Sequence, residues 1–237
     1  MKFLLAILIL CAQSFAAIAY VNGGHTVNGG TSCAVTLSVT SGNALLFAIT
    51  SNSAGTTQGV SDSSSNTYTN IYANDSQGGV ITSIWLGQMG STNASLVVTE
   101  TNSSGANNEM CTASQYSGMA TAASAVDKKA SGAYSAVTTL PAGTTAATTQ
   151  AVEMIIGVFA CTGSNGGTFT AGSGYTLRDN QGYVSSLAVE EKAVSSTGTQ
   201  QATLTSSASS TGGGYTITFV PPGAAGVKRH RGAVIGQ

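Results

Sequence analysis

Short apolar runs separated by clusters of Gly, Ser, Asn and Asp fill most of this chain of 237 residues. This pattern is typical of β-strands joined by turns, and helix signals are almost absent after residue 20. The runs at 44–50 (ALLFAIT) and 153–161 (EMIIGVFAC) are almost continuously apolar, which indicates central strands covered on both faces. The pattern therefore predicts an all-β protein, with strands at residues 33–39, 44–50, 66–72, 80–89, 95–101, 110–116, 153–161, 174–177, 184–194, 201–206 and 215–220.

The two halves of the chain resemble each other weakly. Residues 45–69 can be aligned with residues 154–177, which places Tyr68 opposite Tyr175. Two similar halves of five or six strands suit a two-sheet antiparallel β-sandwich that is jelly-roll-like, with a weak internal two-fold repeat. Two separate immunoglobulin-like domains are the alternative, although no Pro-rich or charged linker lies between the halves. The loose Ala/Ser/Thr stretch at 120–150 is a linker, a long excursion or an edge strand.

Residues 1–19 have the features of a secretory signal peptide. Lys2 precedes an apolar stretch, and Ala17-Ile18-Ala19 fits the small-x-small pattern of a cleavage site. The apolar stretch is shorter than the about 20 residues of a membrane-spanning helix, so an uncleaved anchor is the weaker alternative. A lipoprotein attached through Cys11 is weaker still, because Leu10 stands where a small residue is needed. We therefore expect a secreted protein, extracellular or at the cell surface, with no membrane span after cleavage.

Charged residues are scarce in this chain. They make up 7% of the sequence, against about 25% in an ordinary protein, and 31 Ser and 32 Thr supply much of its polarity. Residues 20–227 hold 4 basic and 9 acidic residues, so they lack the basic excess that a nucleic-acid partner requires. Three further basic residues crowd the C-terminus. We expect a single β-sandwich domain at 20–222, a flexible basic tail at 223–237 and no nucleic acid as partner.

Several segments share a recurring idiom: a Ser-Asp-Ser turn before a Thr-Tyr strand, then an aromatic strand and a Tyr-Ser-Gly strand end. They are VSDSSSNTYT, SIWLGQM, ASQYSGM, AGSGYTL and AVSSTGTQQATLT. In this idiom the chain resembles a broad group of exported or phage-associated bacterial β-sandwich proteins of unknown function. The resemblance covers roughly residues 40–220 and consists of turn and core residues, so it implies a fold only. Gln115 stands where such proteins often have a glutamate, so the resemblance implies no carboxylate role there.

Loss of the signal peptide would leave three cysteines, Cys33, Cys111 and Cys161. An oxidising compartment then permits one disulfide, for which three pairings exist. Because Cys111 and Cys161 each lie at the edge of a strand-like run, we favour a disulfide between these two. The alternative is that all three are small buried hydrophobic residues.

Sequence motifs for catalysis are missing. The chain has no G-x-S-x-G, H-E-x-x-H, P-loop or G-x-G-x-x-G motif, and its two histidines lie near its ends. Glu100 and Glu109 flank one turn and could form a glycosidase pair, although a polar hairpin mouth has the same pattern. Glu190 and Glu191 are adjacent in a strand and point to opposite faces. We therefore expect no catalytic residues, with a glycan-cleaving enzyme as a minor alternative.

Asp62 and Asp75 lie in successive polar turns, and calcium prefers clustered oxygen ligands. Neither turn matches D-x-D-x-D-G, so local backbone hydrogen bonds in Asx turns are the alternative role. We expect no cofactor other than calcium at these two positions.

Exposed aromatic rings are the usual platforms for sugars on β-sandwiches. Trp85 shares its strand face with Ile81 and Met89 and is expected in the core, whereas Tyr72 and Tyr183 lie near turns and are the candidate ligand-binding residues. We expect a secreted, non-enzymatic binding or adhesion module for a glycan or another surface polymer. A structural or assembly subunit of a surface layer, fibre or virion is the alternative, because edge strands with few charges favour self-association.

Overall fold

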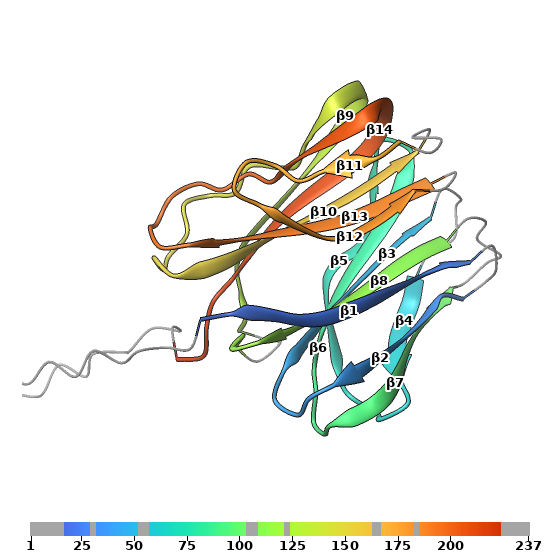
Figure 1. Ribbon diagram of the computed structural model, residues 1–237, viewed down its shortest axis with the longest axis vertical. Coiled ribbons are helices and arrows are strands. Elements are labelled where there is room, and N and C mark those ends of the chain that lie inside the picture. Colours follow the sequence, from blue (N-terminus) through green and yellow to red (C-terminus); the bar gives the residue numbers. More distant parts are fainter. Residues whose placement is uncertain are drawn as a thin grey trace, which may run out of the picture.

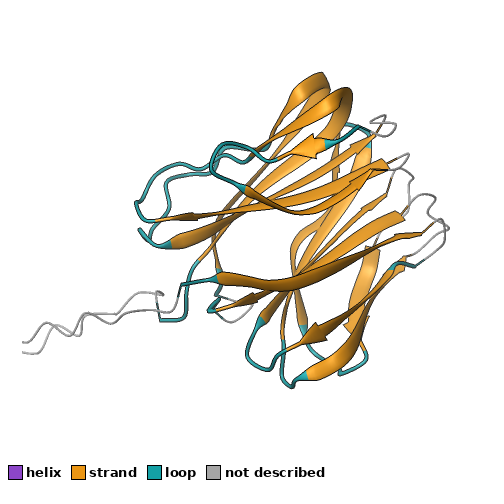
Figure 2. Ribbon diagram, in the orientation of Figure 1, coloured by secondary structure: helices purple, strands orange, loops and turns teal. Residues whose placement is uncertain are grey.

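The computed structural model describes residues 17–28, 32–51, 57–102, 109–120, 124–162, 167–182 and 185–223. About 70% of these residues lie in strands and none lies in a helix, as Figure 2 shows. All strand pairs are antiparallel. The all-β prediction is therefore confirmed. Within these ranges no helix is long and apolar enough to cross a membrane.

The described strands form three sheets, which we name A, B and C, where the sequence predicted two. Sheet A contains, in spatial order, β1 (Ala19–Asn28), β8 (Glu109–Ser117), β3 (Ala44–Ser51), β6 (Val80–Gln88) and β5 (Tyr68–Gln77). Sheet B contains β2 (Ala34–Val39), β7 (Asn93–Asn102) and β4 (Thr57–Asp62). Sheet C contains β11 (Phe169–Thr170), β14 (Thr203–Phe219), β10 (Glu153–Thr162), β13 (Ser185–Val194) and β12 (Thr176–Gly182), and β9 (Val126–Pro141) also pairs with β14.

Three clusters of buried apolar side chains hold these sheets together: one between sheets A and C, one between sheets A and B, and one on the other face of sheet C. All eight residues of β3 are buried, because Leu46 faces sheet C while Phe47 faces sheet B. Strand β10 is buried except at Thr162: Ile156 faces sheet A, and Phe159 belongs to a cluster with residues of β9 and β14. A central strand that is apolar on both faces needs a cover on each side. Sheet B is the extra cover over sheet A, and Figure 1 shows it below sheets A and C.

The strand orders of sheets A and C correspond to each other. The order β1-β8-β3-β6-β5 in sheet A matches β9-β14-β10-β13-β12 in sheet C, with the sequence order of the strands preserved. The cover strands β2, β7 and β4 correspond in the same way to the end of β9, the start of β14 and β11. This is a correspondence of strand order. The weak sequence repeat and the jelly-roll-like topology stay predictions.

The boundaries of the fold differ from those expected at its N-terminal end. Strand β1 begins at Ala19, and Ile18 is buried in the core between sheets A and C. The fold thus includes two residues that the predicted boundary at 20 assigns to the signal peptide. Of the three alternatives for residues 120–150, the structure shows an edge strand, which is β9 of sheet C. The rest of the signal peptide and the basic tail after Gly223 lie outside the described residues.

Candidate functional site

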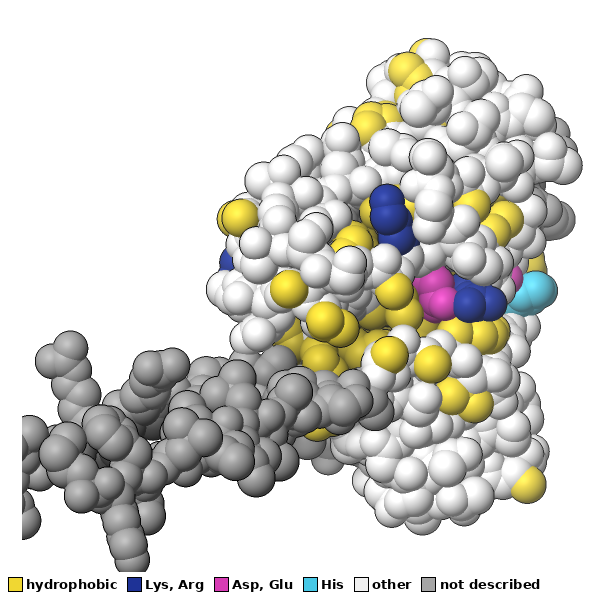
Figure 3. Space-filling view, turned by 60° about the vertical axis from the view of Figure 1, so that its left-hand side comes forward, with side chains coloured by type: hydrophobic (Ala, Val, Ile, Leu, Met, Phe, Trp, Pro, Cys, Tyr) yellow, Lys and Arg dark blue, Asp and Glu magenta, His cyan; other side chains and the backbone are white. Residues whose placement is uncertain are grey.

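A pocket of about 260 Å³ lies where the edge strand β1 of sheet A meets the edge strand β12 of sheet C. Figure 3 shows a histidine side chain beside acidic and basic side chains on a face that carries few charges. His25 is the one histidine in the described ranges. The lining residues come from β1, β8 and β12 and are Tyr20, Gly23, Gly24, His25, Thr112, Ala113, Ser114, Arg178, Asp179 and Asn180.

Each of the two edge strands carries a β-bulge beside the pocket. The pairing of β1 with β8 skips Val21, and the pairing of β12 with β13 skips Arg178. A bulge adds one residue to a strand and turns the side chains that follow it. In β12 the bulge lets two consecutive residues, Arg178 and Asp179, both line the pocket.

The first ionic contact of the pocket joins the two strands directly. His25 Nδ1 lies 2.8 Å from Asp179 Oδ1. The same oxygen accepts a hydrogen bond from the Asn180 backbone N–H, and Oδ2 accepts one from Gln181 Nε2. The side chain of Asp179 is 9% exposed, and that of His25 is 50% exposed. The carboxylate therefore sits behind the imidazole and orients it, with Nε2 left for other partners.

The second ionic contact has the same layout. Arg178 Nη2 donates to Glu191 Oε1 at 2.5 Å, and Glu191 is the more buried of the two. The guanidinium also lies 4.4 Å from the centre of the Tyr20 ring, which packs edge-on against Tyr116. Burial opposes the charge of Arg178, but the Glu191 carboxylate outweighs it and raises the pKa of Arg178 above its ordinary value. Arg178 is therefore a fixed cation stacked on an aromatic ring.

Glycine and hydroxyl groups complete the pocket. A Cβ atom on Gly23 would lie 2.7 Å from Tyr20 Oη, 2.8 Å from the Ala113 carbonyl oxygen and 3.5 Å from Ser114 Oγ, so only glycine leaves this space open. Gly23 pairs with Ser114 across the ladder, and His25 pairs with Thr112. Tyr20 Oη and Ser114 Oγ make no hydrogen bond with any other residue in the described ranges. These two hydroxyl groups are therefore available to a ligand.

The predicted aromatic platforms lie elsewhere. Tyr72 is partly buried, with its ring packed edge-on against Tyr215 at 4.9 Å and the Lys129 ammonium 4.6 Å from its centre. The Tyr215 ring and the Lys129 ammonium occupy space around the Tyr72 ring, which argues against an open surface on which a sugar could stack. Tyr183 lies outside the described residues. Trp85, predicted in the core, is partly buried against the cluster between sheets A and B.

Asp62 and Asp75 are not brought together. Asp62 accepts hydrogen bonds from the backbone N–H groups of Ser64 and Asn66 and from Tyr68 Oη, as in an Asx turn. Burial opposes its charge, but these hydrogen bonds outweigh it and lower the pKa of Asp62. Asp75 lies seven residues beyond Tyr68 on β5, roughly 20 Å away at about 3.3 Å per residue. No group of three or more potential metal ligands occurs within the described ranges.

The predicted disulfide between Cys111 and Cys161 is wrong. Cys111 pairs with Cys33, with their Cα atoms 6.1 Å apart, and the buried Cys161 takes no part in this disulfide. The reason is that the Cys111 and Cys161 side chains point into different cores. Cys111 points from β8 toward sheet B, whereas Cys161 belongs to the core on the far side of sheet C.

The glutamates predicted as possible acid and base are interior groups. Glu100 and Glu109 are fully buried and lie close enough to share a hydrogen bond. Burial raises the pKa of Glu109, and the hydrogen bonds from Asn102 and Glu100 offset only part of this. Glycosidase carboxyl groups stand about 5 Å or more apart around a sugar, so this pair does not fit that geometry. Glu190 and Glu191 do point to opposite faces, toward Gly172 and Arg178 respectively.

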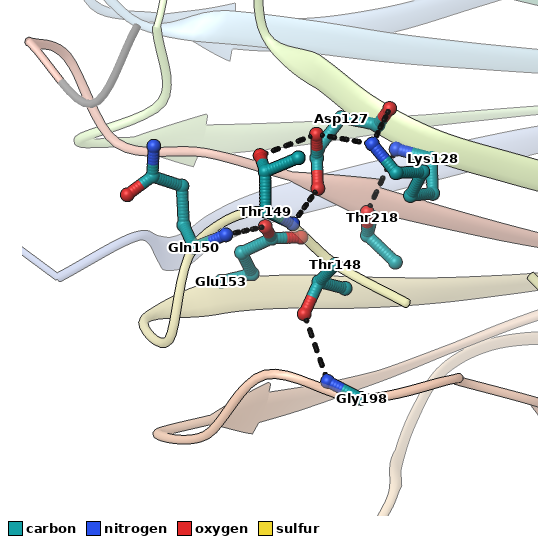
Figure 4. Close-up of polar contacts among 8 residues, drawn as sticks. All are labelled: Asp127, Lys128, Thr148, Thr149, Gln150, Glu153, Gly198 and Thr218. Carbon is teal, nitrogen blue, oxygen red and sulfur yellow. Dashed lines mark hydrogen bonds and ion pairs between the residues drawn. The ribbon is translucent and has the colours of Figure 1, made fainter. Parts of the chain in front are cut away.

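A second polar network joins residues 148–150 to Asp127 of β9 and Glu153 of β10, and joins β9 to Thr218 of β14 (Figure 4). Asp127 accepts hydrogen bonds from the backbone N–H and the hydroxyl of Thr149 and pairs with Lys128. Burial opposes the charge of Asp127, but these bonds outweigh it and lower its pKa to about 2. Burial, together with the nearby Asp127, raises the pKa of Glu153 to about 7. The groups in this network bond to one another, so we assign it a structural role.

The comparisons with known proteins return no match: no model of a protein family fits the chain, and no curated protein or solved structure is significantly similar to it. Sequence reasoning missed the pocket, because no local signal joins His25 to a β12 residue 154 positions away. The two signals that could have drawn attention to it are the single histidine of residues 20–227 and the Arg-Asp-Asn run at 178–180.

Proposed function

We propose that this protein is an exported, non-enzymatic binding module whose pocket between β1 and β12 takes one saccharide unit of a glycan. The observation that carries this proposal is the lining of the pocket: hydroxyl, amide, imidazole and guanidinium groups beside the Tyr20 ring. Ligand pockets usually hold about 300–1,000 Å³, so a volume of about 260 Å³ suits a single small polar unit.

The carboxylates beside the pocket favour binding over cleavage. Asp179 is held by His25, and Glu191 is held by Arg178. A glycosidase needs one protonated carboxyl group that faces the scissile bond and a second one across it. Glu191 lies behind Arg178, and both oxygens of Asp179 already have partners in His25, Asn180 and Gln181, so both carboxylates orient binding groups. The glycan-cleaving alternative gains no support from this arrangement.

Export is supported by two features of the chain. The N-terminal segment has the pattern of a secretory signal. The Cys33–Cys111 disulfide is typical of an oxidising compartment. A glycan at a cell surface is therefore a partner that the protein would meet.

An assembly subunit remains the second candidate, because one edge strand favours it. Strand β9 is sixteen residues long and has no charged residue after Lys129. A long edge without charges is open to pairing with a second chain. Light scattering over a concentration series tests this candidate: a growing multimer supports it, and a monomer at all concentrations contradicts it.

Affinity electrophoresis in gels that contain single soluble polysaccharides tests the binding proposal. At least one polysaccharide should retard the protein, and Ser114→Ala with Asn180→Ala should abolish most of the retardation. Gly59→Ala is the matched control, because a Cβ on this strand glycine meets nothing within 4 Å. If no polysaccharide retards the protein, or if the double variant binds as the wild type does, the proposal is wrong.

A further inference from the structure

We infer that the saccharide unit taken by this pocket carries an anionic group, a carboxylate or a sulfate. This inference rests on the proposed function and names the class of glycan. It is carried by the layout of charges around the pocket. Arg178 lines the pocket with its partner Glu191 behind it, and the neutral donors Ser114 and Asn180 line the same pocket.

The exposures of the paired side chains establish this layout. In the first pair, Asp179 is 9% exposed and His25 is 50% exposed. In the second pair, Glu191 is 6% exposed and Arg178 is 30% exposed. Arg178 lines the pocket and Glu191 is not among the lining residues, so a ligand meets the guanidinium before that carboxylate. Asp179 lines the pocket as well, but its oxygens already contact His25, Asn180 and Gln181. The part of the ligand in contact with Arg178 should be a hydrogen-bond acceptor with negative charge.

The guanidinium has donors left for such a group. Arg178 uses Nη2 for Glu191 and lies over the Tyr20 ring, which fixes its plane. Its remaining N–H groups form a planar fork, and this fork matches the oxygen atoms of a carboxylate or a sulfate. Asn180 and Ser114 add neutral donors at the same pocket.

The overall charge of the protein does not outweigh these local contacts. Residues 20–227 hold 4 basic and 9 acidic residues, so their net negative charge repels anions at long range. Charges on the surface are screened beyond about 8 Å at physiological ionic strength, so the groups that touch the ligand decide its binding. Glu191 is paired with the Arg178 guanidinium, which offsets most of its repulsion of an anion.

Matched pairs of polymers test the inference. Polygalacturonate, alginate and hyaluronan are each compared with their carboxyl-reduced neutral forms, and dextran sulfate is compared with dextran. At least one acidic polymer should bind, and removal of its charge should weaken binding about tenfold or more, the value of one charge-assisted hydrogen bond. Comparison of the uronate polymers with dextran sulfate shows whether the pocket prefers a carboxylate or a sulfate.

Variants assign the effect to the pocket. Arg178→Gln combined with Glu191→Gln removes the cation without leaving a buried carboxylate alone. It should weaken binding of the acidic polymer about ten- to hundredfold, which removes most of the advantage of that polymer over its matched neutral form. Lys192→Gln removes a cation that lies over Tyr175 outside the pocket and is the matched control. Equal binding of charged and neutral forms, or binding of neutral polymers only, overturns the inference and leaves the proposed function standing. Failure of every polymer to bind overturns both.

Discussion

His25 Nδ1 lies 2.8 Å from Asp179 Oδ1, although the two residues are 154 positions apart in the chain. This contact joins the edge strand of sheet A to the edge strand of sheet C and closes one side of the pocket. It is therefore both a link between the two sheets and a part of the binding surface.

Replacement of His25 by Gln separates these two roles. Asp179 keeps its hydrogen bonds from Asn180 and Gln181, and the imidazole is half exposed, so the free energy of unfolding should fall by no more than about 1 kcal/mol. Affinity for a bound polysaccharide should fall about tenfold, because the pocket loses a lining imidazole that can form a hydrogen bond. Urea unfolding and affinity electrophoresis measure the two quantities. A large loss of stability with unchanged affinity would mean that the contact is structural only.

The disulfide gives a prediction about stability. Cys33 and Cys111 close a loop with a sequence separation of 78 residues, for which the chain-entropy model gives about 4 kcal/mol of stabilisation. Cys33→Ala with Cys111→Ala should lower the free energy of unfolding by an amount of this order. Cys161→Ala is the control that leaves the disulfide intact. Peptide mapping without reduction should recover Cys33 joined to Cys111, and recovery of any linkage to Cys161 contradicts the structure.

Stability should depend on pH through buried glutamates. Burial raises the pKa of Glu153 and of Glu190 to about 7, from an ordinary value of 4.5. Between these values the folded protein holds more protons than the unfolded chain, so the free energy of unfolding falls as the pH rises. The stabilisation is fully present below pH 4.5 and is lost above about pH 7, on the order of 3 kcal/mol for each group.

Urea unfolding at pH 5 and at pH 8 measures this dependence. The protein should be more stable at pH 5, and Glu153→Gln with Glu190→Gln should flatten the difference. A free energy of unfolding that rises from pH 5 to pH 8 contradicts the account.

The buried Ile18 predicts where an exported chain is cut. Cleavage before Tyr20 would remove Ile18 from the core and Ala19 from its pairing with Ser117. Ser14-Phe15-Ala16 also has the small-x-small pattern, and cleavage after it keeps both residues. We expect the secreted protein to begin at Ala17, which its intact mass reveals. An N-terminus at Tyr20 would show that the fold does not need these residues.

The sequence predicted those parts of the fold that depend on local patterns. The apolar runs within β3 and β10 identified the two central strands, because continuous burial leaves a continuous apolar signal. Strand β1 was missed because AYVNGGHTVN is polar and glycine-rich, as an edge strand can be. The third sheet was missed as well, because a count of strands does not say how many layers they form.

The site depends on distances that the sequence does not contain. The sequence pattern assigned no role to Arg178 or Asp179, because the bulge that directs both to the pocket leaves no local signal. The cysteine pairing failed for the same reason. Cys111 and Cys161 both lie in central strands, but they face different cores.

The central claim is that the pocket between β1 and β12 is where a glycan binds. A titration followed by two-dimensional ¹H–¹⁵N NMR, with the acidic oligosaccharide that binds best in the polymer panel, locates the contact residue by residue. The account predicts that the backbone signals of Gly23, His25, Ser114 and Asn180 shift together and saturate, while those of Gly59 and Tyr72 do not. Saturable shifts confined to another surface would contradict it.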